Sequence, residues 1–222
     1  LEVPSGYLSD RLGRRPTLIV AAAATTAAHL VFATNASFGA FAVGQVLLAG
    51  GMAFNSGTDS ALLFDSMKAS DRAGEFGTTE GRAQAWALVS MAIASAVGGL
   101  SAGFDLRFAY LLSAVAGAVG LALALAFAEP PREGVLARPP LSQLAAVGNA
   151  LRDRRLAWVF SFMVAMTVFN HVPYELVQPY LRLLLGASTV AGADATPVTA
   201  GIIGSVGLLV SAFASRQSPR WA

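Results

Sequence analysis

Two ionisable side chains, His171 and Glu175, lie four residues apart in a stretch that is otherwise uncharged. This spacing places both groups on one face of a helix. A carboxylate beside an imidazole can take up and release a proton near neutral pH, because each group changes the proton affinity of the other. The pair is therefore a candidate for the substrate or proton path. If the stretch crosses a membrane, the alternative is that Glu175 lies at the headgroup level and His171 only hydrogen-bonds a neighbouring helix.

Two carboxylates and two amides form a second group of candidates. Asp65 is predicted to pair with nearby arginines in a gate, and the alternative is that it is solvated at a helix end. Asp59 lies deeper in the apolar stretch, where it would contact cargo or protons unless it is interfacial. The neutral side chains of Gln45 and Asn55 are candidates to line the same path.

A third candidate is the segment Gly6-Tyr-Leu-Ser-Asp10-Arg11-Leu-Gly13-Arg14-Arg15. Glycine permits a tight turn, and an acid beside several arginines can form charge-assisted hydrogen bonds and cap helix ends. Such a cluster can hold one conformation of a protein against another. A loop that only supplies positive charge would explain the arginines but would leave Gly6, Asp10 and Gly13 unexplained.

The composition requires these residues to be positioned in a bilayer. Of the 222 residues 55% are hydrophobic and 13% are charged, and the mean hydropathy is +0.60. A soluble domain has about a quarter of its residues charged. The chain has no cysteine, which excludes disulfides and thiolate chemistry. It has no HExxH pattern, and no serine lies in the strand-to-helix turn in which GxSxG marks a nucleophile, so neither motif supports an enzyme. We expect no cofactor, metal or nucleic acid, with membrane lipid and a small-molecule substrate as partners.

Uncharged runs locate the membrane spans, because a charge at the centre of the hydrocarbon layer is costly. Residues 16–58 are too long for one span and contain a polar turn at 34–37, so they predict a helical hairpin. Backbone polar groups must be paired within lipid, which predicts helices, and glycines such as Gly99, Gly103 and Gly117 allow close packing. The predicted spans are 16–33, 38–66, 83–104, 108–128, 156–178 and 195–215.

The basic residues are unevenly distributed between the two sides. All but two of the 15 lie in loops on one side, and the exceptions are Arg107 and Arg182. The positive-inside rule makes the richer side cytoplasmic, including the loop 6–15. The segment 129–155 is a predicted cytoplasmic linker with a short amphipathic helix, and it separates a first part, 1–128, from the start of a second, 156–222.

The segment from Gly6 to Arg15 resembles the signature of the cytoplasmic loop between the second and third helices of the major facilitator superfamily, at every fixed position. Residues 56–66 are similar to the fourth-helix end of a bacterial subgroup that is mainly drug-efflux-like, and residues 178–181 resemble a seventh-helix ending. The resemblance implies an all-α polytopic bundle, cut at both ends, from the end of the second helix to the eighth of twelve. The missing helices of the full-length chain would then be partners of this piece.

The resemblance also implies a function. In this superfamily the loop stabilises the outward-facing state through contacts between the two halves, a role that passes to Asp10, Arg11 and Arg14. The implied protein is a secondary transporter in a bacterial inner (plasma) membrane, driven by a proton or ion gradient. We expect proton-coupled efflux of a drug or metabolite, with proton-linked uptake of a sugar or other metabolite as the alternative. A non-transporting membrane protein or an intramembrane enzyme is a more distant alternative.

The sequence departs from the superfamily at two positions. Many proton antiporters carry an arginine near the position of Gln45, and many drug antiporters carry a Gly-Pro pair in the fifth helix. This sequence lacks both.

Overall fold

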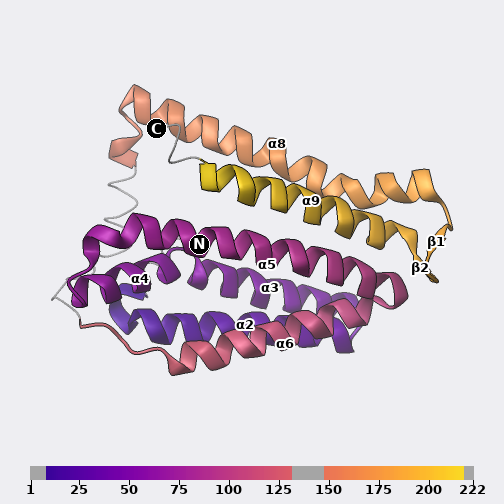
Figure 1. Cartoon of the computed structure of the whole chain (residues 1–222), viewed down its shortest axis with the longest axis horizontal. Helices are drawn as coiled ribbons and strands as arrows, with labels where there is room; N and C mark the ends of the chain where they lie inside the picture. Colours follow the sequence, from indigo (N-terminus) through magenta and orange to yellow (C-terminus); the bar gives the residue numbers. More distant parts are fainter. Residues whose placement is uncertain (1–8, 132–147, 218–222) are drawn as a thin grey trace.

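The computed structural model describes residues 9–131 and 148–217, and nearly all of this part is helical. Gly6 and most of the predicted linker, including the greater part of its amphipathic helix, lie outside the described residues, while residues 148–150 at the end of that helix are helical. The long helices run roughly parallel to one another along one axis (Figure 1). The elements are α2 (Arg14–Thr34), α3 (Phe38–Asn55), α4 (Thr58–Ala69), the 3-10 turn η1 (Ala73–Glu75), α5 (Phe76–Phe104), α6 (Leu106–Ala126), α8 (Arg154–Leu185) and α9 (Ala195–Gln217).

Short polar residues begin several of these helices. Ser37 accepts a hydrogen bond from the N–H of Ala40 at 3.3 Å, at the polar turn between α2 and α3. Asp105 accepts one from the N–H of Arg107 at 2.8 Å at the start of α6. Each cap satisfies one of the backbone donors that a helix start leaves unpaired. The sequence therefore fixes these helix starts locally.

The helix predicted over residues 38–66 is in fact two helices, which is a correction. The helix α3 ends at Asn55, and α4 begins at Thr58. Between them Gly57 has φ of +74°, a left-handed conformation that glycine adopts without steric cost. A polar pair, Asn55-Ser56, precedes this glycine. The break follows from that local sequence, which the long apolar run conceals.

Five stretches of the described residues are helical, long and apolar enough to cross a membrane. They are Arg14–Thr34, Phe38–Ala69, Ala73–Phe104, Leu106–Ala126 and Ala195–Ala214. The helix α8 is not among them, although its 32 residues exceed the roughly 20 that a spanning helix needs. A sixth span at 156–178 and the division into two halves therefore stay predictions.

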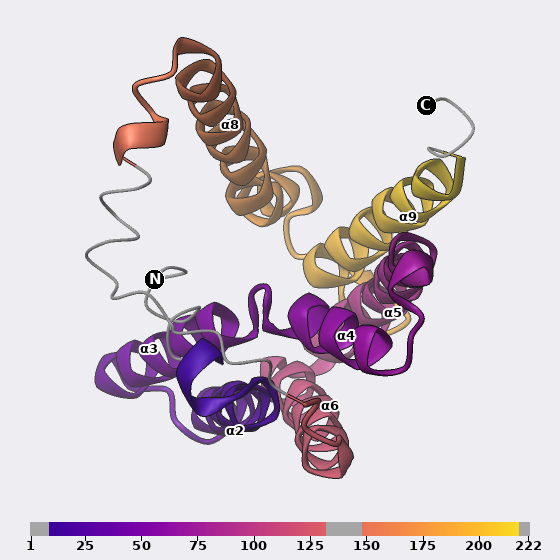
Figure 2. The same cartoon turned by 90° about the vertical axis from the view of Figure 1, so that its left-hand side faces the viewer.

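Small residues set how the helices pack. The helix α2 lies between α3 and α6, whereas α9 packs on α5 and also contacts α8. Figure 2 shows α8 standing apart from α2 and α3. A Cβ atom built on Gly99 of α5 would lie only 2.5 Å from the carbonyl oxygen of Pro197 and 2.8 Å from Cα of Gly201 in α9. The α5–α9 contact therefore depends on the absence of side chains at these positions.

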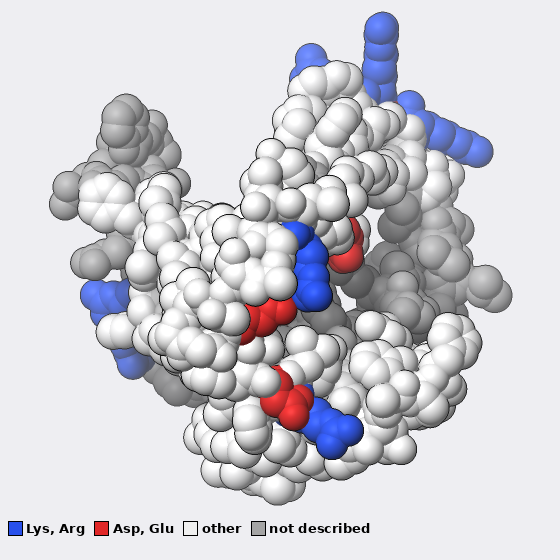
Figure 3. Space-filling view, turned by 90° about the vertical axis from the view of Figure 1, so that its right-hand side faces the viewer, with Lys and Arg blue, Asp and Glu red and all other residues white. Residues whose placement is uncertain are grey.

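A small hairpin joins α8 to α9, and it contains the only strands in the described residues. The strands β1 (Thr189–Val190) and β2 (Ala193–Asp194) pair antiparallel. The two residues between them, Ala191 and Gly192, both have positive φ, as a tight two-residue hairpin turn requires. Seen from this end, the surface carries few charged side chains among many uncharged ones (Figure 3).

Candidate functional site

The guanidinium group of Arg14 joins the loop before α2 to the helix α4. Its Nη1 lies 2.7 Å from Oδ1 of Asp10, and its Nε lies 3.2 Å from Oδ2 of Asp65. The side chains of Arg14 and Asp65 are 24% and 36% exposed, so water screens the pair only in part. A charge-assisted pair in this setting is stronger than a fully exposed one. One arginine thus holds two acids from different elements.

Glu129, just after α6, caps the start of α2. Its Oε1 and Oε2 accept hydrogen bonds from the N–H groups of Arg14 and Arg15 at 2.9 and 2.7 Å. Gly13 precedes the helix and has no side chain to act as a cap, and its φ of +117° favours glycine. A carboxylate at a helix start is favourable both as an acceptor and as a charge.

The other contact between α2 and α6 at this point is made by Arg15. Its Nη2 donates to the carbonyl oxygen of Leu125, in the last turn of α6, at 2.7 Å. Cations are favoured near the carbonyl end of a helix. The end of α6 and the start of α2 are therefore held together from both sides, by Glu129 and by Arg15.

A buried pair of hydroxyl groups connects this cluster to the break in the predicted span 38–66. Ser9 and Thr58 are 2% and 3% exposed, and the hydroxyl of Thr58 donates to Oγ of Ser9 at 3.3 Å. The same Oγ accepts from Nη1 of Arg14 at 3.0 Å. We call Ser9, Asp10, Arg14, Asp65 and Glu129 the Arg14 network. The network connects the start of α2, the helix α4 and the segment after α6. Its Ser9 also contacts Thr58, the residue that directly follows Gly57.

Sequence reasoning found some members of this network and missed others. The contact predicted between Asp65 and the arginines of the loop is present in the structure, whereas a gate role for it stays a prediction. Ser9 and Glu129 were missed. One signal for Glu129 was available in the sequence. This acid directly follows a predicted span, on the side that is predicted to be rich in arginine. The side chain of Arg11 is exposed.

Asn55 and Asp59 line one cavity, which lies among α2, α3, α4 and α6. Its volume is about 380 Å³, and the rest of its wall is mainly apolar, with Gly51, Gly117 and Gly120 contributing no side chains. Oδ1 of Asp59 also accepts the N–H of Ser60 at 2.8 Å. Gln45 is exposed on α3 and does not line this cavity. The structure therefore brings two of the three predicted residues together.

The pair on α8 is formed as the four-residue spacing predicts. Nε2 of His171 lies 3.5 Å from Oε1 of Glu175, and the two side chains are 69% and 63% exposed. They lie on a different helix from the cavity with Asp59. The site residues thus form three groups: the Arg14 network, the cavity with Asn55 and Asp59, and the pair on α8. No cluster of three or more acids and histidines suited to a metal occurs among the described residues.

A second contact joins the region of the break to α5. The hydroxyl of Ser60 donates to Oε1 of Glu80 at 2.6 Å. Glu80 lies in the first part of α5, which begins at Phe76 and so extends seven residues before the predicted span. The helix continues through Glu80 and Arg82 because charged residues are tolerated at the end of a span, where their side chains can reach water.

The family model described as Major Facilitator Superfamily matches residues 1–222. The chain belongs to the major facilitator superfamily. Neither the curated proteins nor the solved structures contain a match to it. Members of this superfamily are secondary transporters rather than enzymes, and the five apolar helices fit a multi-pass membrane protein with part of the superfamily fold. The all-α fold class predicted from the sequence is confirmed, with the small hairpin as an addition.

Proposed function

We propose that this superfamily member exports a small organic molecule, a drug or a metabolite, in exchange for protons across a bacterial plasma membrane, by alternating access. The Arg14 network is the latch of its cytoplasmic gate. The observation that carries this proposal is the bridge from Arg14 to both Asp10 and Asp65, because it ties the loop before α2 to α4.

The network can act as a latch because its energy is of the size that shifts a conformational equilibrium. Each partly screened bond from Arg14 is worth about 1 kcal/mol, between the values for exposed pairs and for buried charged hydrogen bonds. A difference of about 1.4 kcal/mol changes a two-state equilibrium tenfold. The bond between Arg14 and Asp65 joins two separate elements, so its loss on opening favours the closed state by about fivefold.

Proton coupling is assigned to His171 and Glu175. When the carboxylate is ionised and the imidazole is neutral, the pair can accept a proton or a cationic substrate, but the two compete for the same negative charge. Competition of this kind is what antiport requires, because binding of the proton releases the cargo. The distance of 3.5 Å is within the range of an ion pair once the imidazole is charged.

Transport by the full-length protein tests the proposal. Everted vesicles, whose outer face is the cytoplasmic one, are given a fluorescent cationic dye in the medium, and its accumulation in the lumen is driven by an imposed pH gradient with an acidic lumen. We expect Glu175→Gln and His171→Ala to abolish the pH dependence, and Asp65→Asn to alter the rate at every pH. Arg72→Gln is the matched control, because Arg72 pairs only with the exposed Glu75 in the described structure. Wild-type pH dependence in both α8 variants would remove the pair from the mechanism.

Proton-linked uptake of a sugar or other metabolite is the second candidate. The observation in its favour is that the stretch around Gln45 lacks the arginine that many proton antiporters of the superfamily carry. The two functions differ in the direction of the cargo. Drug susceptibility of cells that express the complete gene separates them, since only an exporter raises the tolerated concentration.

A further inference from the structure

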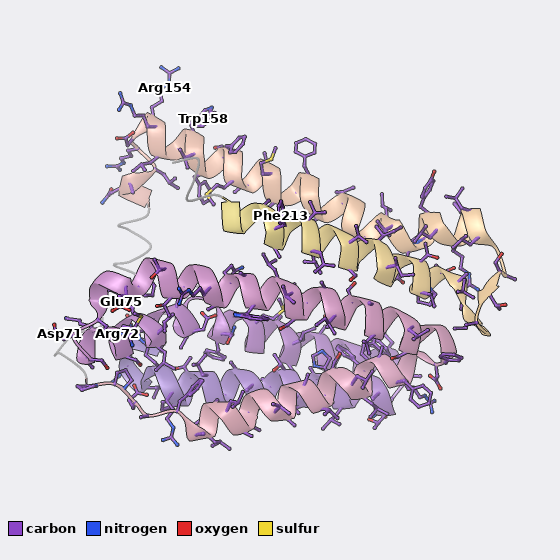
Figure 4. All side chains as sticks on the ribbon, in the orientation of Figure 1. Asp71, Arg72, Glu75, Arg154, Trp158 and Phe213 are labelled. Carbon is purple, nitrogen blue, oxygen red and sulfur yellow. The ribbon has the colours of Figure 1, made fainter. Side chains whose placement is uncertain are left out.

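The first turns of α8 carry a hollow that the proposed function does not use. It has a volume of about 750 Å³ and is lined by Asp153, Arg154, Arg155, Trp158 and Val159. Figure 4 shows Arg154 and Trp158 pointing from α8 away from the other helices. This end of α8 lies at the same end of the molecule as α4 (Figure 1). A cationic hollow beside exposed aromatic rings at the start of a long helix is suited to a ligand that is part anion and part hydrocarbon.

The charge at this position is positive and is not neutralised locally. Three arginines, at 152, 154 and 155, and one acid, Asp153, leave two net positive charges. Oδ1 of Asp153 accepts the N–H groups of Arg155 at 2.8 Å and Leu156 at 3.4 Å, so this carboxylate is engaged in capping the helix. Within residues 9–131 and 148–217, neither Arg154 nor Arg155 forms an ion pair. Their guanidinium groups can therefore bind an anion.

An aromatic surface continues from the arginines along α8. The rings of Trp158 and Phe162 stack, with centroids 5.5 Å apart and planes 10° apart, and both side chains are exposed, at 66% and 49%. Spacing of four residues puts Arg154, Trp158 and Phe162 on one helix face. Tryptophan is enriched at the level of lipid headgroups, where its ring is partly in hydrocarbon and its N–H is in water.

We propose that this hollow binds an anionic phospholipid, with the phosphate between the guanidinium groups of Arg154 and Arg155 and an acyl chain along Trp158 and Phe162. Basic residues beside a span attract anionic headgroups, and arginine suits phosphate because it can donate two parallel hydrogen bonds. Free phosphate would use the arginines but would leave the stacked rings exposed. A lipid occupies both parts of the surface. This site is separate from the Arg14 network and from the transport cycle.

Fluorescence of Trp158 tests the proposal directly. The chain has two other tryptophans, at 86 and 221, and replacing both with phenylalanine leaves Trp158 as the only reporter. The chain is reconstituted into phosphatidylcholine vesicles that contain brominated phosphatidylglycerol or brominated phosphatidylcholine, since bromine quenches tryptophan only at close range. We expect about thirtyfold tighter apparent binding of phosphatidylglycerol than of phosphatidylcholine, the gain expected for two arginines near a headgroup at about 1 kcal/mol each.

Variants assign that preference to the arginines. Arg154→Gln with Arg155→Gln should remove the preference for phosphatidylglycerol and keep the quenching by phosphatidylcholine, which also shows that the variant is folded and inserted. Arg72→Gln with Arg82→Gln, an equal charge change elsewhere, should keep the preference. Equal quenching of the unmodified site by both lipids would overturn the proposal. An absence of quenching by both lipids would also overturn it, because protein would then cover this face. Loss of the preference on addition of inorganic phosphate would overturn it as well.

Discussion

The bond between Arg14 and Asp65 gives the sharpest test of the Arg14 network. Met67 is a buried residue of α4, two positions beyond Asp65. Because the chain has no cysteine, Met67→Cys introduces a single thiol. A polar maleimide can modify this thiol only while α4 is separated from its neighbours, so the labelling rate in membranes measures the open population. The reagent reports on opening without any knowledge of the cargo.

The expected rates follow from the geometry. Asp65→Asn keeps the shape but removes one partly screened charge pair worth about 1 kcal/mol, so labelling should become about fivefold faster. Arg14→Gln removes the same pair and also the local pair with Asp10, which does not contact α4, so it should give a similar increase of about fivefold. In the Arg14→Gln background, Asp65→Asn should add nothing, because its partner is already absent. Labelling within twofold of the parent in both single variants would refute the latch, and a multiplied effect in the double variant would refute the direct pair.

Three further predictions concern stability. Glu129→Gln weakens the cap on α2 and should lower the free energy of unfolding by about 1 kcal/mol, seen as a lower midpoint in thermal unfolding; an unchanged midpoint would mean that the cap contributes nothing. Gly99→Val should disrupt the α5–α9 contact because its Cβ would meet the Pro197 carbonyl, costing about 1–3 kcal/mol, whereas Gly98→Val has no atom within 4 Å of its Cβ and should be neutral. The pKa of Asp194 is lowered, chiefly by the backbone hydrogen bond that it accepts at the start of α9. Its stabilising effect is therefore complete above the usual aspartate pKa of about 3.9 and is lost as the pH falls below that value, so acid should lower the thermal midpoint more in the parent than in Asp194→Asn.

Much of the helical architecture could be predicted because charge is so costly in a bilayer. The uncharged run at 108–128 corresponds to α6, for example, and the turn at 34–37 separates α2 from α3. The bounds were less accurate where helices leave the membrane. The helix α8 continues through Arg182 to Leu185, because a helix need not end where the hydrocarbon does.

Contacts between residues that are close in the sequence could be predicted, whereas contacts between distant residues could not. His171 and Glu175 are four residues apart on one helix, so helical periodicity predicts their pair. Asp10 and Arg14 are equally close in the sequence, although Gly13 interrupts the helix between them. Glu129 lies 115 residues from Arg14, and no local rule says that the end of α6 meets the start of α2. The contact of Ser9 with Thr58 was hidden for the same reason, and also because small hydroxyl residues are common in such spans.

The break at Gly57 has a mechanical consequence for the predicted span 38–66. A helix without a break moves as a rod, so a displacement at one end would reach the other end. Here α3 and α4 meet at a single residue with positive φ, and α4 can tilt with the loop that it contacts while α3 keeps its packing on α2. A residue with a side chain at position 57 would raise the free energy of this left-handed conformation by about 1–2 kcal/mol, which would make the joint less flexible. Substitution there should therefore slow the opening of the gate without changing which molecules the cavity accepts.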